Sequence, residues 1–217
     1  MQTLGLSDAP QPTDNLFKRL LWPEIANGYD VDLVSQQGFW VCFVVAVFST
    51  IVLIATGQPL VGILIGATYL LGGMGVRQRS VAAAILIFSS YLLGRLASME
   101  AMFLGLPGGG NPLVGIVATM LLFANVRATF LARRWQRAEA PSDISELPEQ
   151  MTTSFGDKLA NVLPEKLWPA GKYAFYPLAI IVIVISVLSM IGLPIMKAKQ
   201  AAATTDDPVT MDAQTPR

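Results

Sequence analysis

From Leu33 to Val76 the chain reads LVSQQGFWVCFVVAVFSTIVLIATGQPLVGILIGATYLLGGMGV, a run of 44 residues without a charged side chain. One α-helix of that length would measure about 66 Å, whereas the hydrocarbon core of a bilayer is about 30 Å thick. The run must therefore fold back, and its natural turn is Thr56-Gly57-Gln58-Pro59, where glycine and proline interrupt the apolar pattern. We expect one transmembrane helix over Gly38–Ala55 and a second over Pro59–Val76.

Three further apolar stretches extend this pattern. Val81–Ala97 is short and contains Arg95 near its end, from where an arginine side chain can reach the lipid headgroups. A fourth helix is expected over Pro112–Ala132 and a fifth, the most hydrophobic, over Tyr173–Ile195. The composition agrees, with 53% hydrophobic residues, 14% charged residues and a mean hydropathy of +0.53. The sequence predicts an all-α integral membrane protein, a five-helix transmembrane bundle with one or two interfacial amphipathic helices.

Segments of a different composition flank these helices. Leu16–Pro23 and Leu163–Pro169 each combine basic residues, leucine and a tryptophan followed by proline, which is typical of interfacial anchors; a specific lipid or partner site is the alternative. Phe155, Leu159 and Val162 follow a helical spacing and predict one amphipathic helix, whose apolar face suits either lipid or another subunit. The predicted organisation is a cytoplasmic N-terminal segment with an interfacial helix (1–37), four transmembrane helices (38–132), a cytoplasmic linker with an amphipathic helix (133–172), the fifth transmembrane helix (173–195) and a disordered non-cytoplasmic tail (196–217).

Orientation is predicted from the basic residues, because positively charged loops are retained in the cytoplasm. Among the connections on the other side only Arg95 would lie at a helix edge, while Lys197, Lys199 and Arg217 follow the last span. We therefore expect a cytoplasmic N-terminus and a C-terminus outside, in a bacterial cytoplasmic membrane. This orientation places ten basic residues in cytoplasmic segments: Lys18, Arg19, Arg77, Arg79, Arg133, Arg134, Arg137, Lys158, Lys166 and Lys172.

Two groups of residues are expected to hold the helices in place. Gly62 and Gly66, four residues apart, allow two helices to approach closely, either within the chain or between two copies. The expected helix-packing residues are Gly62, Gly66, Ser89, Ser90, Gly94 and Asn125. The expected interfacial anchors are Trp22, Arg77, Arg79, Arg133, Arg134, Trp135 and Trp168.

The sequence contains no constellation typical of catalysis. Histidine is absent and Cys42 is the single cysteine, which excludes an intramolecular disulfide or thiolate cluster and removes the commonest metal ligand. Asp30 and Asp32 form an Asp-x-Asp pair, which we interpret as a turn with solvated acids rather than a cation site. A formal net charge of zero gives no reason to expect nucleic acid as a partner. We expect no enzymatic activity, no metal and no cofactor.

The function expected from these features is that of a non-catalytic multi-pass membrane subunit or scaffold, which assembles with a larger membrane complex. The alternative is a component of a channel or carrier for a small uncharged or hydrophobic solute. The residues along such a path would be Ser89, Ser90, Thr119 and Asn125. The expected partners are the lipid bilayer and other membrane protein subunits or a second copy of the chain.

Overall fold

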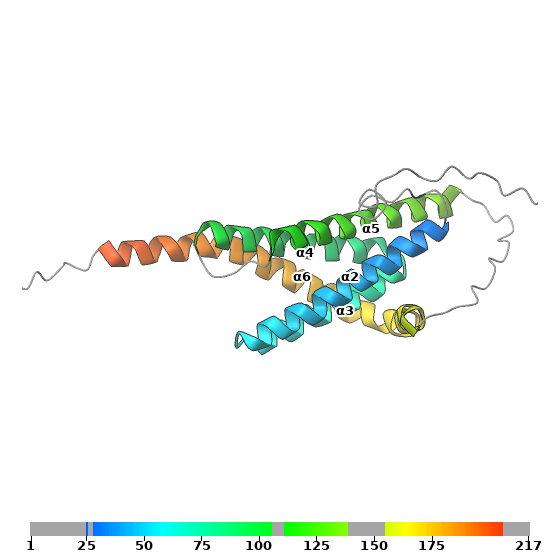
Figure 1. The fold of residues 1–217 in the computed structure, drawn as a ribbon, viewed down its shortest axis with the longest axis horizontal. Helices are drawn as coiled ribbons and strands as arrows, with labels where there is room; N and C mark the ends of the chain where they lie inside the picture. Colours follow the sequence, from blue (N-terminus) through cyan, green and yellow to red (C-terminus); the bar gives the residue numbers. More distant parts are fainter. Residues whose placement is uncertain (1–24, 26–27, 106–110, 139–154, 206–217) are drawn as a thin grey trace, which may run out of the picture.

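The apolar stretches of the sequence form one helical bundle (Figure 1). The computed structural model describes Ile25 and residues 28–105, 111–138 and 155–205. Those residues form five α-helices and no strand, and each helix is long and apolar enough to cross a membrane, which confirms the predicted all-α fold and the five apolar helices. The helices are α2 (Gly28–Ala55), α3 (Pro59–Arg77), α4 (Val81–Phe103), α5 (Pro112–Ala138) and α6 (Phe155–Thr205).

The turn between α2 and α3 forms where glycine and proline predict it. Gly57 has a φ of +82°, a left-handed conformation that glycine adopts readily, and the Gln58 amide donates to the Leu53 carbonyl at 2.8 Å. Pro59 then opens α3, a position at which the N–H that proline lacks would have no helical acceptor. The predicted reversal is therefore confirmed, and α2 and α3 form an antiparallel hairpin (Figure 1).

A second tight turn joins α3 to α4. Arg79 has a φ of +55°, and a residue other than glycine adopts this left-handed conformation at a cost of roughly 1 kcal/mol. The Ser80 hydroxyl accepts a hydrogen bond from the Ala83 amide at 3.4 Å and so caps the start of α4. The two short turns bring α2, α3 and α4 together as consecutive antiparallel helices.

The two ends of the bundle differ in charge. Arg77, Arg79 and Arg133 lie at one end, which we name the basic end. Gly57 and Gly105 lie at the other, the hairpin end, where Gly105 ends α4 with a φ of +73°. In Figure 1 the basic end is on the right, and the cyan tip of the α2–α3 hairpin lies apart from the orange end of α6. The hairpin thus diverges from α6 toward the hairpin end.

Three helices are longer than predicted. α2 begins at Gly28 instead of Gly38, and α5 ends at Ala138, six residues later than expected. α4 continues to Phe103, so the loop predicted after Ala97 begins later. In each case the predicted helix boundary was placed where polar or charged residues appear. A helix tolerates such side chains near its ends, because they reach partners or the headgroup region.

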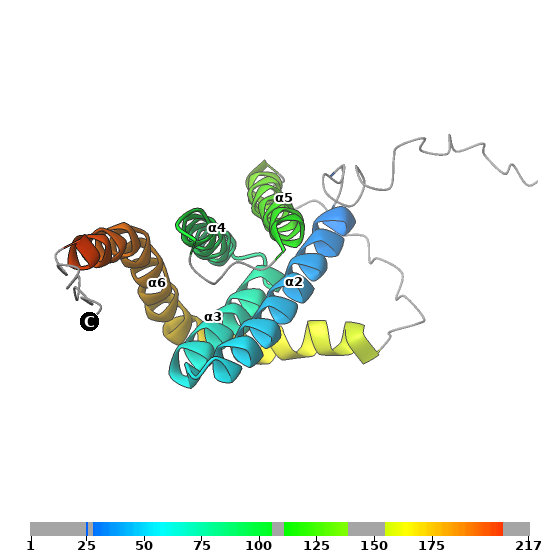
Figure 2. The same cartoon turned by 60° about the vertical axis from the view of Figure 1, so that its left-hand side comes forward.

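The fifth helix differs most from its prediction. The expected linker helix and transmembrane helix form one element, α6, of 51 residues, which also continues to Thr205 within the tail predicted to be disordered. Four prolines lie inside it, and each removes a backbone hydrogen bond and favours a bend: Pro164, Pro169, Pro177 and Pro194. Figure 2 shows its first, yellow part turned steeply away from the remainder. The predicted N-terminal interfacial helix, with Trp22, lies outside the described residues.

Small residues bring the helices together in the core. A Cβ atom on Gly72 of α3 would overlap the Ile87 side chain of α4, and one on Gly73 would lie 2.8 Å from the Cys42 Cβ of α2. Helix interfaces within a bilayer depend on such close approaches, because lipid supplies little hydrophobic driving force between helices. The central buried cluster joins all five helices through Cys42, Ala46, Tyr69, Ala83, Ile87, Leu122, Phe175 and Ala179.

The glycine pair of α3 packs against α2. A Cβ atom on Gly62 would lie 3.1 Å from the Leu53 Cβ, and one on Gly66 would overlap the Thr50 hydroxyl. That hydroxyl donates to the Gly62 carbonyl at 3.2 Å. Of the two arrangements that the sequence leaves open, the structure contains the one within the chain, so this face of α3 is already occupied.

Candidate functional site

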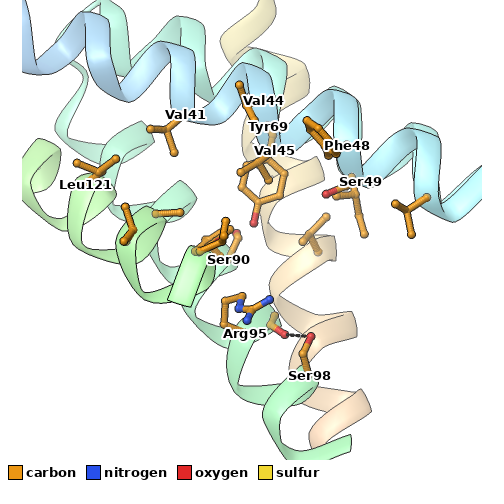
Figure 3. Close-up of a pocket in the computed structure, with 18 of the residues that line it drawn as sticks. Val41, Val44, Val45, Phe48, Ser49, Tyr69, Ser90, Arg95, Ser98 and Leu121 are labelled. Atoms are coloured by element: carbon orange, nitrogen blue, oxygen red, sulfur yellow. Dashed lines mark hydrogen bonds between the residues drawn. The ribbon is translucent and has the colours of Figure 1, made fainter. Parts of the chain in front are cut away.

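A groove of about 870 Å³ lies between the α2–α3 hairpin and helices α4 and α5, with α6 contributing part of its wall (Figure 3). Along α2 its lining extends from Gln37 to Leu53, which spans about 24 Å of helix. Small-molecule sites in proteins usually measure roughly 300 to 1,000 Å³. The groove therefore has the volume of a ligand site and an elongated shape.

Most of the groove wall is apolar. On α2 the lining side chains Val44, Phe48 and Val52 are 50%, 66% and 55% exposed. Such a surface is unfavourable in water but compatible with acyl chains or an apolar ligand. The apolar lining side chains are Trp40, Val41, Val44, Val45, Phe48, Val52 and Leu53 of α2, Ile65 of α3, Val114, Val117, Ala118 and Leu121 of α5, and Val182 of α6.

One hydroxyl group in the wall lacks a partner. Ser90 of α4 is buried, and its Oγ has no hydrogen-bond partner among the described residues. Serines inside helices usually donate to the carbonyl four residues earlier, as Ser98 and Ser186 do here, each at 2.9 Å. The Tyr69 ring, also buried, extends from α3 toward Ser90 (Figure 3). Ser90 is thus a buried polar group in the groove wall whose hydrogen bond is not satisfied by a described residue.

Arg95 is the single charged residue in the groove lining. Because α4 continues to Phe103, Arg95 lies eight residues, or about 12 Å along the axis, before the end of the helix, which is farther from the end than predicted. Its Nη2 donates to the Asn111 carbonyl at 3.5 Å, the upper limit for a hydrogen bond. No described carboxylate lies within ion-pair distance of it. A weakly bonded guanidinium therefore faces an apolar groove.

Gly115 of α5 makes room for this guanidinium. A Cβ atom there would overlap Nε, Cζ and Nη2 of Arg95, so the arginine extends from α4 directly over the backbone of α5. Glycine in the middle of a helix costs roughly 1 kcal/mol relative to alanine, which indicates a packing reason for it. The Thr119 hydroxyl bonds within α5, to the Gly115 carbonyl at 2.7 Å, and does not line the groove.

A cluster of charged side chains closes the basic end. Asp32 of α2 accepts hydrogen bonds from two nitrogens of Arg77, at 3.0 and 3.2 Å, and from Arg79 at 2.8 Å. Arg77 also donates to the Ser35 hydroxyl at 2.9 Å. The predicted solvated turn at Asp30 and Asp32 is wrong, because both residues lie in α2. The Asp32 carboxylate instead ties α2 to the turn between α3 and α4.

Asn125 lies away from the groove, at the contact of α5 with α2. Its Nδ2 donates to the Val34 carbonyl at 3.2 Å, and a Cβ atom on Gly38 would overlap the amide. Its Oδ1 is buried and has no partner among the described residues. Of the four residues proposed from sequence to line a path, Ser90 lines the groove, whereas Ser89, Thr119 and Asn125 do not. Gly94, expected in helix packing, also lines it.

The residues predicted as interfacial anchors occupy different environments. Arg133 and Arg134 are exposed near the end of α5, and Arg133 shares a pocket of about 330 Å³ with Arg79 at the basic end. Trp168 packs inside the bundle, where a Cβ atom on Gly75 would overlap it and its ring lies 5.6 Å from that of Phe175. Trp135 belongs to α5, but its side chain is not described.

Neither a metal site nor a similar protein adds to this picture. No three Cys, Asp or Glu side chains gather to hold a metal ion in the described part of the chain. No protein family, curated protein or solved structure matches the sequence or the fold. The geometry of the groove therefore carries the functional argument.

Proposed function

We propose that this chain is a non-catalytic integral membrane protein, whose groove binds a hydrophobic or amphiphilic small molecule taken from the bilayer. The observation that carries the proposal is the groove of about 870 Å³, walled by apolar side chains and containing two polar groups that lack strong partners, Ser90 and Arg95. Binding sites for small molecules commonly combine apolar walls with a few placed polar groups. The proposal lies within the hydrophobic-solute alternative that the sequence suggests.

The length and apolar character of the five helices support this reading of the groove. Five helices are long and apolar enough to cross a bilayer, and the groove lies along their lengths, between Gln37 near the basic end and Leu53 near the hairpin end. In this setting its occupant comes from the surrounding lipid, which holds hydrophobic molecules at high local concentration. Because lipid tails compete for the apolar walls, selectivity depends on packing and on the polar groups.

A pair of glycine variants tests the proposal. A Cβ atom on Gly94, in the groove wall, meets nothing within 4 Å, and the same holds for Gly192 of α6, which does not line the groove. In Gly94→Leu the new side chain therefore occupies the groove, and its Cβ atom overlaps no neighbouring atom. Gly192→Leu makes the same change outside the groove and is the matched control. The protein is purified in lipid nanodiscs and labelled with a clickable alkyl diazirine, and the labelled peptides are identified by mass spectrometry.

We expect labels on the groove-lining segments of α2 and α5 in the wild type and in Gly192→Leu. Labelling of these segments should fall several-fold in Gly94→Leu, while labelling of the outer helix faces stays unchanged. Uniform labelling of all lipid-facing helices, insensitive to Gly94→Leu, would show that the groove holds no more than bulk lipid and would contradict the proposal.

Assembly with a larger membrane complex remains a second candidate. The observation that favours it is the first part of α6, where Val162, Leu163 and Leu167 are 48%, 37% and 47% exposed on a segment that bends away from the rest of α6. Because Gly62 and Gly66 already pack against α2, a subunit contact would use this segment instead. Native mass spectrometry after gentle solubilisation should then detect a stoichiometric partner, which is lost when Leu163 and Leu167 are changed to serine.

A further inference from the structure

The charge of the groove restricts what it can bind. Arg95 is the one charged residue among the lining side chains, and a guanidinium stays protonated in proteins. It carries five N–H donors, of which one makes a contact of 3.5 Å with the Asn111 carbonyl. The backbone of Arg95 lies about 12 Å before the end of α4, and its guanidinium reaches Asn111 and the first turn of α5. A positive charge beside an apolar wall is costly unless an anion or water neutralises it. The groove is thus complementary to an anion at this position.

The guanidinium is also held in a defined place. Gly115 lacks the Cβ atom that would overlap Nε, Cζ and Nη2, so the planar group rests against the α5 backbone. Two adjacent N–H groups of an arginine match the two oxygens of a carboxylate, and this bidentate geometry is the strongest that the side chain makes. Apolar lining side chains lie across the groove from Arg95, with Leu121 on one side, Val44 in the middle and Phe48 on the other side (Figure 3).

We infer that the ligand of the groove is a long-chain carboxylate, with its head group on Arg95 and its alkyl chain along the apolar wall. The inference rests on the proposed function and names its substrate class. A carboxylate carries one negative charge, which Arg95 balances. A phosphate monoester carries about −1.5 to −2 charges at neutral pH and would leave an excess negative charge in an apolar site with a single cation.

Competition experiments distinguish head groups on the same chain. Hexadecanoate, hexadecanol and hexadecyl phosphate compete with the alkyl diazirine for groove labelling in nanodiscs, at a mildly alkaline pH that keeps the acid ionised. We expect hexadecanoate to compete roughly tenfold better than hexadecanol, the size of effect typical of a hydrogen-bonded charge pair. Arg95→Gln should abolish this preference, and Arg95→Lys should retain part of it.

Two further variants separate the role of Arg95 from general effects on the fold. Arg133→Gln removes an exposed arginine outside the groove and should leave the preference for hexadecanoate unchanged. Gly115→Ala displaces the guanidinium without removing it, so it should weaken hexadecanoate while leaving hexadecanol within about twofold, which also reports that the groove is folded.

The other possible outcomes contradict either the carboxylate inference, the choice of head group or the proposed function. Equal competition by hexadecanoate and hexadecanol in the wild type, or no effect of Arg95→Gln, would overturn the carboxylate inference while groove labelling still supports the proposed function. Stronger competition by hexadecyl phosphate than by hexadecanoate would overturn the choice of head group. If none of the three competes and labelling is uniform, the proposed function itself fails.

Discussion

At the scale of single residues, Gly38 and Asn125 form a close packing contact between α2 and α5. The Asn125 amide lies over Gly38 and donates to the Val34 carbonyl, which joins α5 to α2 at a buried position. An amide in an apolar environment is stabilised only while its hydrogen bonds are kept. Its role is therefore to fix the packing of α5 on α2, and Asn125 does not line the groove.

Replacing Gly38 with alanine should destabilise the protein. The new Cβ atom would overlap the buried Asn125 amide, and overpacking of this kind costs about 1 to 3 kcal/mol in the free energy of unfolding. Gly192→Ala, on α6, meets nothing within 4 Å and should raise that free energy by up to about 1 kcal/mol through helix propensity. Denaturant titration in mixed micelles, followed by circular dichroism, measures both. Equal effects of the two substitutions would contradict the tight contact.

Part of the site could be predicted from the residues themselves. Ser90 and Gly94 are recognisable as small or polar residues in an apolar helix, and both line the groove. The significance of Arg95 was missed because the predicted helix ended at Ala97, whereas six further residues continue α4 to Phe103. Gly115 carries no signal of its own: its importance depends on an arginine of another helix, and only the three-dimensional packing brings the two together.

At the scale of elements, the turns were predictable and the helix ends were not. The Gly57-Gln58-Pro59 turn follows from the conformational preferences of two residue types. By contrast, α2 includes Asp32 because its carboxylate finds Arg77 and Arg79 on the neighbouring turn. The local sequence shows that an aspartate is unfavourable in an apolar helix. It does not show the arginines, distant in the sequence, that pair with Asp32 and compensate for this cost.

The first part of α6 is the element whose place in the membrane can be measured directly. This segment bends away from the rest of α6, exposes Val162, Leu163 and Leu167, and carries Lys166, as expected for a helix lying in the membrane interface. We predict that nitroxide labels at these four positions, in a Cys42→Ala background, report nearly the same depth in the bilayer. A spanning helix would change depth by about 1.5 Å per residue.

Accessibility to a lipid-soluble and a water-soluble relaxation agent gives the depth of each label. Labels on Ile180, Val184 and Leu188, in the later part of α6, serve as the spanning reference, because these side chains are 55%, 49% and 61% exposed. A steady change of depth from Val162 to Leu167, like that of the reference, would contradict an interfacial position for the first part of α6.

At the scale of the whole molecule, the groove forms because the α2–α3 hairpin diverges from the other helices. The α2–α3 hairpin is held to α4 at the basic end by the Asp32 cluster, while toward the hairpin end it separates from α6 (Figure 1). The groove is lined by side chains of all five helices, so no single helix contains it. Sequence analysis predicts the helices well, but a cavity between them depends on crossing geometry, which short-range patterns do not encode.

The positions of the basic residues also predict the orientation of the chain in the membrane. Arg77, Arg79 and Arg133 gather at the basic end, and basic residues near spans are retained in the cytoplasm. Fusions of a paired cytoplasmic and periplasmic reporter at four positions test this, each site carrying both reporters as its own control. We expect cytoplasmic signals after Arg79 and Gln150, and external signals after Gly109 and Arg217. Because five spans place the two ends of the chain on opposite sides, a cytoplasmic signal after Arg217 would mean that one of the five apolar helices does not cross the membrane.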